Sequence, residues 1–459
     1  MISPDGSSHV SVVLGRNGQG KSRILSAIAT TFQLLHDYGR SGSRRGLPVS
    51  RLEYIAQGSH HEVTTRGSEV IVIKDGDRVP VDAAILPRRV IGLSMTPFDK
   101  FPMGGAARQL DLFRPDSVDV YSYLGMRERM GQISTGALLS RAIEGLVARV
   151  ARDDRGRLTG VFEMLGFKPS IEVIYRFQER QLLMALAGGA KAEEILTLTR
   201  SNSLPRDRLR SQLSSMSEDM DELRAAASHV LGRGSRNHFH FGLDLTYPDP
   251  GMVDVYEAVQ LLRRFGLIRL HALDVVRKDG TVIDLNEASS GELSIAITFM
   301  SLAGRLEDDS LVLIDEPETN LHPEWQARYL DLLLETFGSY RNCHFVLATH
   351  SPLILSDAPP NATLASLSGE SLRYGSEVSG RPVDYLLVEA FDVATRDNYY
   401  VQEQLVKALR LAADGEAKGS EYQDVVRTLA KIRPIITDSP GVVDLIGDLE
   451  KIAKRATDE

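Results

Sequence analysis

The chain has 459 residues, of which 42% are hydrophobic and 25% are charged, and its formal net charge is −9 at pH 7. This composition is typical of a soluble globular protein with two or three domains, or with one domain that carries a large insertion. The negative net charge excludes nucleic-acid binding driven by bulk charge, so any such surface would have to be a local basic patch.

The single cysteine, Cys343, excludes an internal disulfide framework and a Cys-rich metal site, and it fits a reducing cytoplasm. The first residues, MISPDGSSHV, lack the basic start and apolar core of a secretory signal. The most apolar runs, such as SIAITFMSLAG, reach only about half the length of a membrane span. We therefore expect a soluble cytoplasmic protein.

The N-terminal part predicts an α/β arrangement. HVSVVLG (residues 9–15) is a β-branched run that predicts a strand, and GKSRILSAIATTFQLL predicts the helix that follows it. SEVIVIKDGDRV then predicts two strands joined by an Asp-Gly turn, and RRVIGLSM predicts another strand. We assign residues 1–105 to the N-terminal lobe of an α/β core.

The rest of the chain divides into three parts. Apolar residues recur mostly at helical spacing over 106–236, which predicts a helical insertion. SLVLIDEPE and CHFVLATHSP are compact apolar runs typical of buried parallel strands, and they place the C-terminal lobe of the core at 237–392. Residues 393–459 predict a helical tail suited to partner contacts. The predicted fold class is α/β, with a mostly parallel sheet flanked by helices.

The stretch GRNGQGKS fits G-x-x-x-x-G-K-[ST] between a predicted strand and a predicted helix, which is the context of a phosphate-binding loop (Walker A). Glycines let the backbone N–H groups face the phosphates, the lysine reaches the β- and γ-phosphates of ATP, and the serine hydroxyl binds Mg²⁺. The alternative is a chance Gly-rich turn. The candidate residues are Gly15, Arg16, Asn17, Gly18, Gln19, Gly20, Lys21 and Ser22, with Lys21 also catalytic.

LVLIDEPE (residues 311–318) resembles the acidic half of such a site (Walker B). A strand would place Asp315 at its tip as a ligand of the Mg²⁺ shell, and Glu316 could polarise the attacking water. The alternative is a buried strand that ends in a solvated acidic turn.

The stretch VLATHSP places His350 at the end of another apolar strand. An imidazole at that point could hydrogen-bond the γ-phosphate and report whether it is present. The alternative is a structural histidine at the end of a strand.

The stretch NEASSGELS (residues 286–294) leads into a predicted helix and has the composition of a second anion-binding helix N-terminus. The alternative is a simple helix cap, with serine as N-cap and glutamate in the first turn, which accounts for the same residues. The candidate residues are Ser289, Ser290, Gly291 and Glu292.

Taken in order, GRNGQGKS, ASSGE, LVLIDEPE with TNLHP, and ATHSP resemble the motif series of the ABC-type ATPases over residues 8–105 and 240–356. In that family two subunits pair head to tail, and each signature helix closes on the ATP held by the other subunit. The resemblance implies a homodimer in which Ser289, Ser290 and Gly291 contact a γ-phosphate in trans.

The branch of the family follows from the long insertion and from SSGE and DEPETNLHP, which look like the soluble SMC, RecF and OLD ATPases. VIGLSMTPFDKFP and EASSGELS are most similar to the ATPase subunit of Septu-type and retron-associated anti-phage systems, with the PARIS ATPase a competing resemblance. This implies an ATP-dependent sensor that regulates a separate effector, such as a nuclease. The alternatives are a RecF- or SMC-like DNA-repair or chromosome-maintenance ATPase and an OLD-like nuclease.

Three features depart from the family pattern. Only about eight residues precede the Walker A strand, where the family usually has one or two further strands. No glutamine occupies the Q-loop position, for which Asp99 in TPFDKF is the candidate. LLVEAFD imitates the start of a TOPRIM nuclease motif, but no D-x-D follows, so we interpret Glu389 and Asp392 as ordinary polar residues.

Other candidates are weaker. SHHE (59–62) and HFH (238–240) could hold a metal, but no third ligand is evident and we favour solvated loops. A basic cluster could meet nucleic-acid phosphates or could decorate a helix face. Its members are Arg200, Arg206, Arg208 and Arg210, with Arg233 and Arg236 further along the chain.

Overall fold

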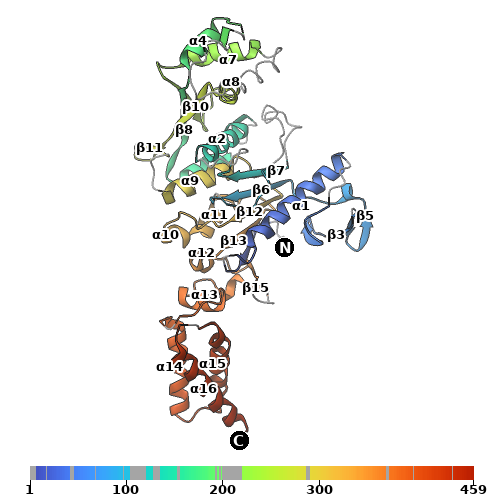
Figure 1. Cartoon of the computed structure of the whole chain (residues 1–459), viewed down its shortest axis with the longest axis vertical. Helices are drawn as coiled ribbons and strands as arrows, with labels where there is room; N and C mark the ends of the chain where they lie inside the picture. Colours follow the sequence, from blue (N-terminus) through green and yellow to red (C-terminus); the bar gives the residue numbers. More distant parts are fainter. Residues whose placement is uncertain are drawn as a thin grey trace.

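The computed structural model describes residues 7–16, 18–41, 46–67, 69–96, 98–103, 120–127, 135–151, 156–191, 194–195, 198, 220–285, 290–367, 372–395, 397–436 and 438–458. The molecule is elongated, with a central α/β core between an upper lobe and a C-terminal helical bundle (Figure 1). None of the described helices combines the length and apolarity that a membrane span requires.

A seven-stranded sheet forms the core, in the order β15-β14-β1-β13-β12-β6-β7. All its neighbouring strands are parallel except β15, which runs antiparallel to β14. Every residue of β6 and β12 is buried, as expected for strands covered on both faces. The strands are β1 (His9–Leu14), β6 (Arg89–Ser94), β7 (Tyr121–Gly125), β12 (Ser310–Asp315), β13 (His344–Thr349), β14 (Thr363–Ser366) and β15 (Leu372–Tyr374).

Helices cover both faces of this sheet. Helix α1 (Lys21–Ser41) contacts β6, β12 and β13 on one face, while α2 (Thr135–Ala151) and α9 (Ser290–Ala303) pack together on the other. The last two cross closely, since a Cβ on Gly145 would lie 3.0 Å from Gly304 Cα. The predicted α/β class with a mostly parallel sheet is confirmed. Short helices complete the layers: α3 (Gly156–Met164), α10 (Pro323–Gln326), α11 (Tyr329–Phe337), α12 (Pro352–Ser356) and α13 (Val383–Glu389).

An antiparallel meander lies beside α1, in the order β2-β3-β4-β5. Its last turn is the predicted Asp-Gly hairpin: Asp75 and Gly76 have φ of 51° and 95°, the left-handed values that a tight hairpin requires. The strands are β2 (Arg51–Ala56), β3 (Ser59–Arg66), β4 (Glu69–Lys74) and β5 (Asp77–Val79), followed by the 3₁₀ turn η1 (Val81–Ala83).

The upper lobe is built on a second antiparallel sheet, in the order β11-β10-β8-β9. Helices α7 and α8 pack on one face of it, with α4 against α7 (Figure 1). The strands are β8 (Phe167–Phe177), β9 (His238–Asp244), β10 (Ile268–Arg277) and β11 (Val282–Asp284); the helices are α4 (Arg180–Ala187), α7 (Met220–Arg233) and α8 (Met252–Arg264).

The middle of the chain differs from the sequence prediction. The segment 106–236 contains the helices α2, α3, α4 and α7, but it also contains β7, which joins the core sheet, and β8, which joins the upper sheet. A boundary at 105/106 therefore separates β6 from its partner strand, and one at 236/237 separates β8 from β9. Both strands differ from the helical prediction for physical reasons. YSYLG is too short for a clear period, and the two-residue alternation of apolar residues in FKPSIEVIYRF lies between helical segments.

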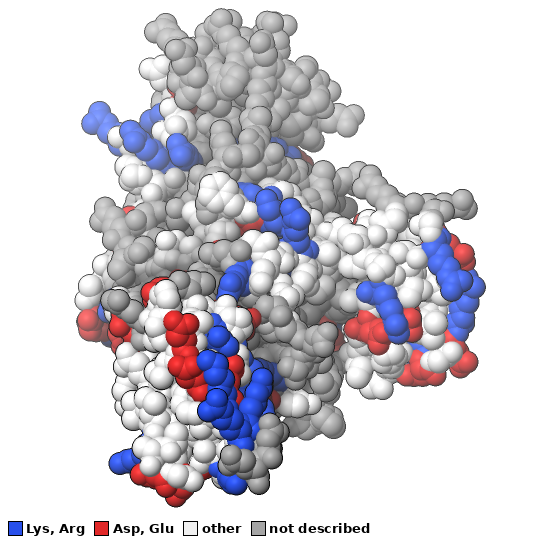
Figure 2. Space-filling model, turned by 60° about the horizontal axis from the view of Figure 1, so that its bottom comes forward, with Lys and Arg blue, Asp and Glu red and all other residues white. Residues whose placement is uncertain are grey.

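The last part of the chain is a three-helix bundle with its own apolar core. Its helices are α14 (Tyr399–Ala413), α15 (Ser420–Ile432) and α16 (Pro440–Asp458), with 3₁₀ turns η3 (Gly375–Glu377) before it and η4 (Arg433–Ile435) within it. Acidic and basic side chains run side by side over the forward face in Figure 2. Ion pairs within the bundle, such as Lys407–Glu421 and Arg433–Glu450, compensate part of its charge.

Candidate nucleotide site

The candidate site lies at the carboxyl edge of the core sheet. Strand β13 lies between β1 and β12 and pairs with both. The loops that leave these three strands carry GRNGQGKS, THSP and DEPE, so the sheet order brings together motifs that are about 300 residues apart in the chain. Carboxyl ends of parallel strands are the usual place for ligand sites in open α/β sheets.

The phosphate-binding loop runs from the end of β1 to the start of α1. Gly18 and Gly20 have φ of 84° and 100°, which a side chain would make unfavourable, and a Cβ on either would meet no atom within 4 Å. The Lys21 ammonium is buried and donates to the carbonyls of Gly15 at 2.7 Å and Arg16 at 3.3 Å. Asn17 lies outside the described residues. The loop thus has the shape of an anion cradle with a cation at its centre.

Ser22 and Asp315, the two candidate metal ligands, are in direct contact. The Ser22 hydroxyl donates to Asp315 Oδ1 at 3.0 Å. Asp315 is 1% exposed, and burial raises the pKa of its carboxyl to about 6 against the lowering effect of the Ser22 bond. Hydroxyl and carboxylate oxygens are ligands that Mg²⁺ prefers, and a bound cation would offset the free-energy cost of burying the negative charge of Asp315. The residues present therefore fit a Mg²⁺ ion.

Glu316 occupies an unusual backbone conformation directly after the tip of β12. Its φ is 49°, in the left-handed region that non-glycine residues rarely adopt. Its N–H donates to the Ala348 carbonyl at 2.9 Å, which ties this turn to β13. The side chain is half-buried, and no described residue donates a hydrogen bond to its carboxylate. Strain of this kind is concentrated at functional sites.

His350 is held by Glu318, a residue that the sequence analysis did not select. Glu318 Oε1 accepts from His350 N at 2.7 Å and lies 3.0 Å from His350 Nδ1. The hydrogen bond to Glu318 raises the pKa of His350. Burial favours a higher pKa for Glu318, but the bonds from His350 outweigh it and the pKa is lowered. DEPE contains this third acid, but its partnership with His350 depends on β12 and β13 lying side by side, which no local motif indicates.

The signature segment lies against the loop that follows Walker B. Helix α9 begins at Ser290, and a Cβ on Gly291 would lie 3.3 Å from both Asn320 O and His322 N. Ser289 and the side chains of Ser290 and Glu292 lie outside the described residues. The structure thus places Gly291 beside TNLH, and the predicted phosphate contact of this segment stays a prediction.

Asp99, the Q-loop candidate, belongs to a buried polar network. Its Oδ1 pairs with Arg127 Nη2 at 2.6 Å, and its Oδ2 accepts from Tyr123 OH at 2.7 Å. The network borders the candidate site, because the carbonyl of the next residue, Lys100, accepts from the Ser26 hydroxyl of α1 at 2.6 Å. The side chain is therefore engaged in structure at the border of the site.

The weaker candidates are not brought together. His61 is a buried strand residue that stacks on Tyr54 at 4.9 Å, so the solvated-loop interpretation of SHHE is wrong. The predicted solvated loop at HFH is also strand, in β9. Among the described residues no group of three His, Cys, Asp or Glu could hold a metal ion. Arg200, Arg206, Arg208 and Arg210 lie outside the described residues.

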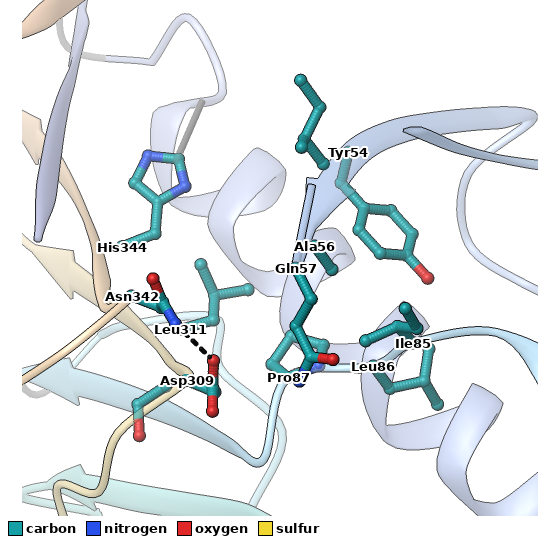
Figure 3. Close-up of a pocket in the computed structure, with 12 residues that line it drawn as sticks. Tyr54, Ala56, Gln57, Ile85, Leu86, Pro87, Asp309, Leu311, Asn342 and His344 are labelled. Carbon is teal, nitrogen blue, oxygen red and sulfur yellow. Dashed lines mark hydrogen bonds between the residues drawn. The ribbon is translucent and has the colours of Figure 1, made fainter. Parts of the chain in front are cut away.

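A separate hollow of about 520 Å³, counted with the solvent at its mouth, lies at the opposite edge of the core sheet, between the β2–β3 turn and the starts of β12 and β13 (Figure 3). Its walls include Tyr54 and Leu311, and Asn342 Nδ2 donates to Asp309 Oδ1 at 3.0 Å across its floor. It contains none of the predicted site residues.

Residues 188–356 match the protein family described as "AAA domain, putative AbiEii toxin, Type IV TA system". This part of the chain is similar to AAA-type ATPase domains. The match includes the signature segment, Walker B and the switch histidine.

Three curated proteins are similar over short segments. "Retron Ec83 probable ATPase" of Escherichia coli is 27% identical over 27% of this chain and 24% of its own length. "Retron Vc95 probable ATPase" of Vibrio cholerae serotype O1 biovar El Tor is 35% identical over 18% of this chain and 17% of its own length. "Protein ea59" of Escherichia phage lambda is 30% identical over 24% of this chain and 22% of its own length. The matched part thus spans about a quarter or less of each relative.

Solved structures with some similarity include the SMC head domain from Thermotoga maritima, at 14% identity and a TM-score of 0.30, over 80% of this chain and 88% of that one. The SmcHead bound to the C-winged helix domain of ScpA has 14% identity and a TM-score of 0.27, over 80% and 87% of the two chains.

Proposed function

We propose that this chain is a cytoplasmic ATPase that binds ATP with Mg²⁺ at the carboxyl edge of the core sheet. The observation that carries the proposal is the contact of Ser22 with Asp315 at 3.0 Å, directly after Lys21, whose ammonium is buried against the loop carbonyls. Phosphate cradle, cation and metal-binding oxygens then form a single site, as in-line phosphoryl transfer requires. The similarity of residues 188–356 to AAA domains supports the same proposal.

Each residue has a distinct role in this proposal. Lys21 leaves the loop carbonyls and neutralises the β- and γ-phosphates, while Ser22 and Asp315 hold Mg²⁺, which would screen the phosphate charge. Glu316, with no hydrogen-bond donor among the described residues, orients and polarises the attacking water. His350, oriented by Glu318, donates a hydrogen bond at the γ-phosphate.

We further propose that two copies pair head to tail when ATP is bound. Gly291 lies against Asn320 and His322 of its own chain, and no described contact joins it to the phosphate-binding loop. In the paired form that we propose, the N-terminus of α9, with Gly291 buried against the Asn320–His322 segment of its own chain, closes on the nucleotide of a second copy, where its N–H groups would favour an anion.

The biological role we propose is regulation of a separate effector, such as a nuclease, in anti-phage defence. The two relatives whose names include "Retron" support this role, as does the resemblance of the motifs to Septu- and retron-associated ATPases. The upper lobe and the C-terminal bundle are the surfaces for such a partner, because the core edge is reserved for nucleotide.

The test is ATP turnover together with molar mass in solution, measured by light scattering. Glu316→Gln is expected to abolish turnover and to accumulate an ATP-bound dimer. Lys21→Ala is expected to bind no nucleotide and therefore to stay monomeric. A Glu316→Gln protein that remains monomeric with ATP and Mg²⁺ contradicts the paired form. Metal-dependent DNA cleavage lost on Asp392→Asn, but not on Lys21→Ala, would favour an OLD-like nuclease instead.

A further inference from the structure

The upper sheet has one face that no described helix covers. Buried residues alternate with exposed ones along β8 and β9, and the buried set joins the main apolar core beneath α7 and α8. The opposite face carries polar side chains and two hollows. One of them, of about 790 Å³ counted with the solvent at its mouth, is lined by Arg176, Phe177, Gln178, Arg269, Leu270 and His271.

Strand register places three basic side chains in one row on this open face. Arg176 of β8 pairs with His238 of β9 on one side and with Arg269 of β10 on the other. Residues that pair across antiparallel strands lie on the same face. His271 is the unpaired residue at a register shift in β10, and it stacks on His238 with ring centroids 5.1 Å apart. Four basic or titratable side chains thus meet at one end of the sheet.

The two arginines of this row have no compensating acid. Both are exposed, and neither forms a hydrogen bond or ion pair with any described residue. Like charges directly opposite each other destabilise a sheet. The positive surroundings act on His238 as well: slight burial lowers its pKa, and the charges of His271 and Arg176 lower it further. An anion bound between the arginines would remove this repulsion.

The basic surface continues beyond the row. The Arg180 guanidinium donates to the carbonyl of Ser235 at 3.1 Å and to that of Arg236, in the turn that leads into β9. An acidic residue follows four positions from Arg176 along β8, where Glu172 pairs with His240 at 2.6 Å. An extended polyanion would therefore cross the row and leave over the turn at 233–237, away from the acidic half.

We propose that this end of the open sheet face, the arginine row Arg176–Arg269 with His238 and His271, binds the phosphate backbone of a nucleic acid. Arginine binds phosphate with paired N–H donors, and an open sheet face with ring side chains suits an extended strand. The phosphates of a nucleic acid are regularly spaced, so they can contact several cations of this row at once. A single small anion could not. The site is remote from the nucleotide edge and does not depend on ATP hydrolysis.

The experiment measures binding of fluorescein-labelled 30-nucleotide single-stranded DNA, single-stranded RNA and duplex DNA by fluorescence anisotropy between 50 and 200 mM NaCl. It uses the full chain with Lys21→Ala, so that the ATP site cannot contribute. Arg176→Ala with Arg269→Ala is expected to weaken binding about 10-fold or more at low salt and to reduce the slope of log K against log salt by roughly 1.4 for a single strand. The probe that binds most tightly shows whether the phosphate backbone that this face prefers belongs to single-stranded DNA, single-stranded RNA or duplex DNA.

The matched control is Arg78→Ala with Arg427→Ala. It removes the same charge from two exposed ion pairs, one in the β2–β5 meander and one in the C-terminal bundle. Binding that is unchanged in this control supports the proposal. A parent protein that binds none of the probes at 50 mM NaCl overturns it, as does an equal loss in the control. Displacement of DNA by polyglutamate at equal charge concentration would also overturn it, because an acidic protein would then be the partner.

Discussion

The core sheet and the upper sheet treat charge in opposite ways. At the carboxyl edge of the core sheet, Lys21 is buried against loop carbonyls, and His350 is paired with Glu318. On the open face of the upper sheet, Arg176 and Arg269 lie opposite each other with no acid between them. The first arrangement fits the proposed site for a small anion and a metal, because its polar groups are already held in place. The second is an open surface whose repulsion only an external anion relieves.

The largest effect is expected from Lys21→Ala. Loss of the ammonium should lower ATP turnover by about 100-fold or more, because a preorganised cation is removed from the transferring phosphate. Turnover is measured by phosphate release. Arg176→Ala, which removes a cation from the upper lobe, should leave turnover unchanged. Equal losses in the two variants would contradict separate roles for the two charged regions.

Arg127→Met should destabilise the fold by about 3 kcal/mol, because it leaves the buried carboxylate of Asp99 without its partner. Urea unfolding gives the free energy. The control is Arg78→Met, which breaks an exposed pair with Glu69 and should cost under about 1 kcal/mol. Similar costs for both would show that the polar network at the border of the nucleotide site is no more stabilising than surface charge.

Glu318→Gln should lower turnover by about 10-fold, because His350 loses the carboxylate charge that favours its protonated, hydrogen-bonded form. His350→Gln in the same background should add little further loss, since the two residues act as a unit. Additive losses measured in the four proteins of this double-mutant cycle would contradict the positioning role.

The smallest effect is a pH dependence of stability. Because the pKa of His350 is raised, its protonation stabilises the fold. This stabilisation is full below the ordinary pKa of 6.5 and is lost as the pH rises through the raised pKa. Because the pKa of Glu318 is lowered, its ionised form also stabilises the fold. This stabilisation is full above the ordinary pKa of 4.5 and is lost as the pH falls through the lowered pKa. The difference in melting temperature between wild type and Glu318→Gln should therefore be greatest between pH 4.5 and 6.5. A difference that does not vary with pH would exclude an ionic pair.

The nucleotide edge could be predicted from the sequence because each of its motifs is local. GRNGQGKS and DEPE each specify a turn and a strand end, and parallel pairing then brings Ser22 to Asp315. The partnership of Glu318 with His350 was not predictable in this way, since it depends on β13 lying beside β12 in the sheet. The arginine row was harder still: Arg176 and Arg269 are 93 positions apart in the sequence, and only the register of β8 with β10 makes them neighbours.

The central claim is that the phosphate-binding loop and the tip of β12 form one site for ATP and Mg²⁺. Isothermal titration of ATP into wild type and Asp315→Asn, with Mg²⁺ and with EDTA, tests it most directly. We predict that Mg²⁺ strengthens ATP binding to wild type, and that Asp315→Asn abolishes this gain while keeping the affinity measured in EDTA. Equal Mg²⁺ dependence in the two proteins would contradict the claim, because Asp315 would then take no part in holding the metal.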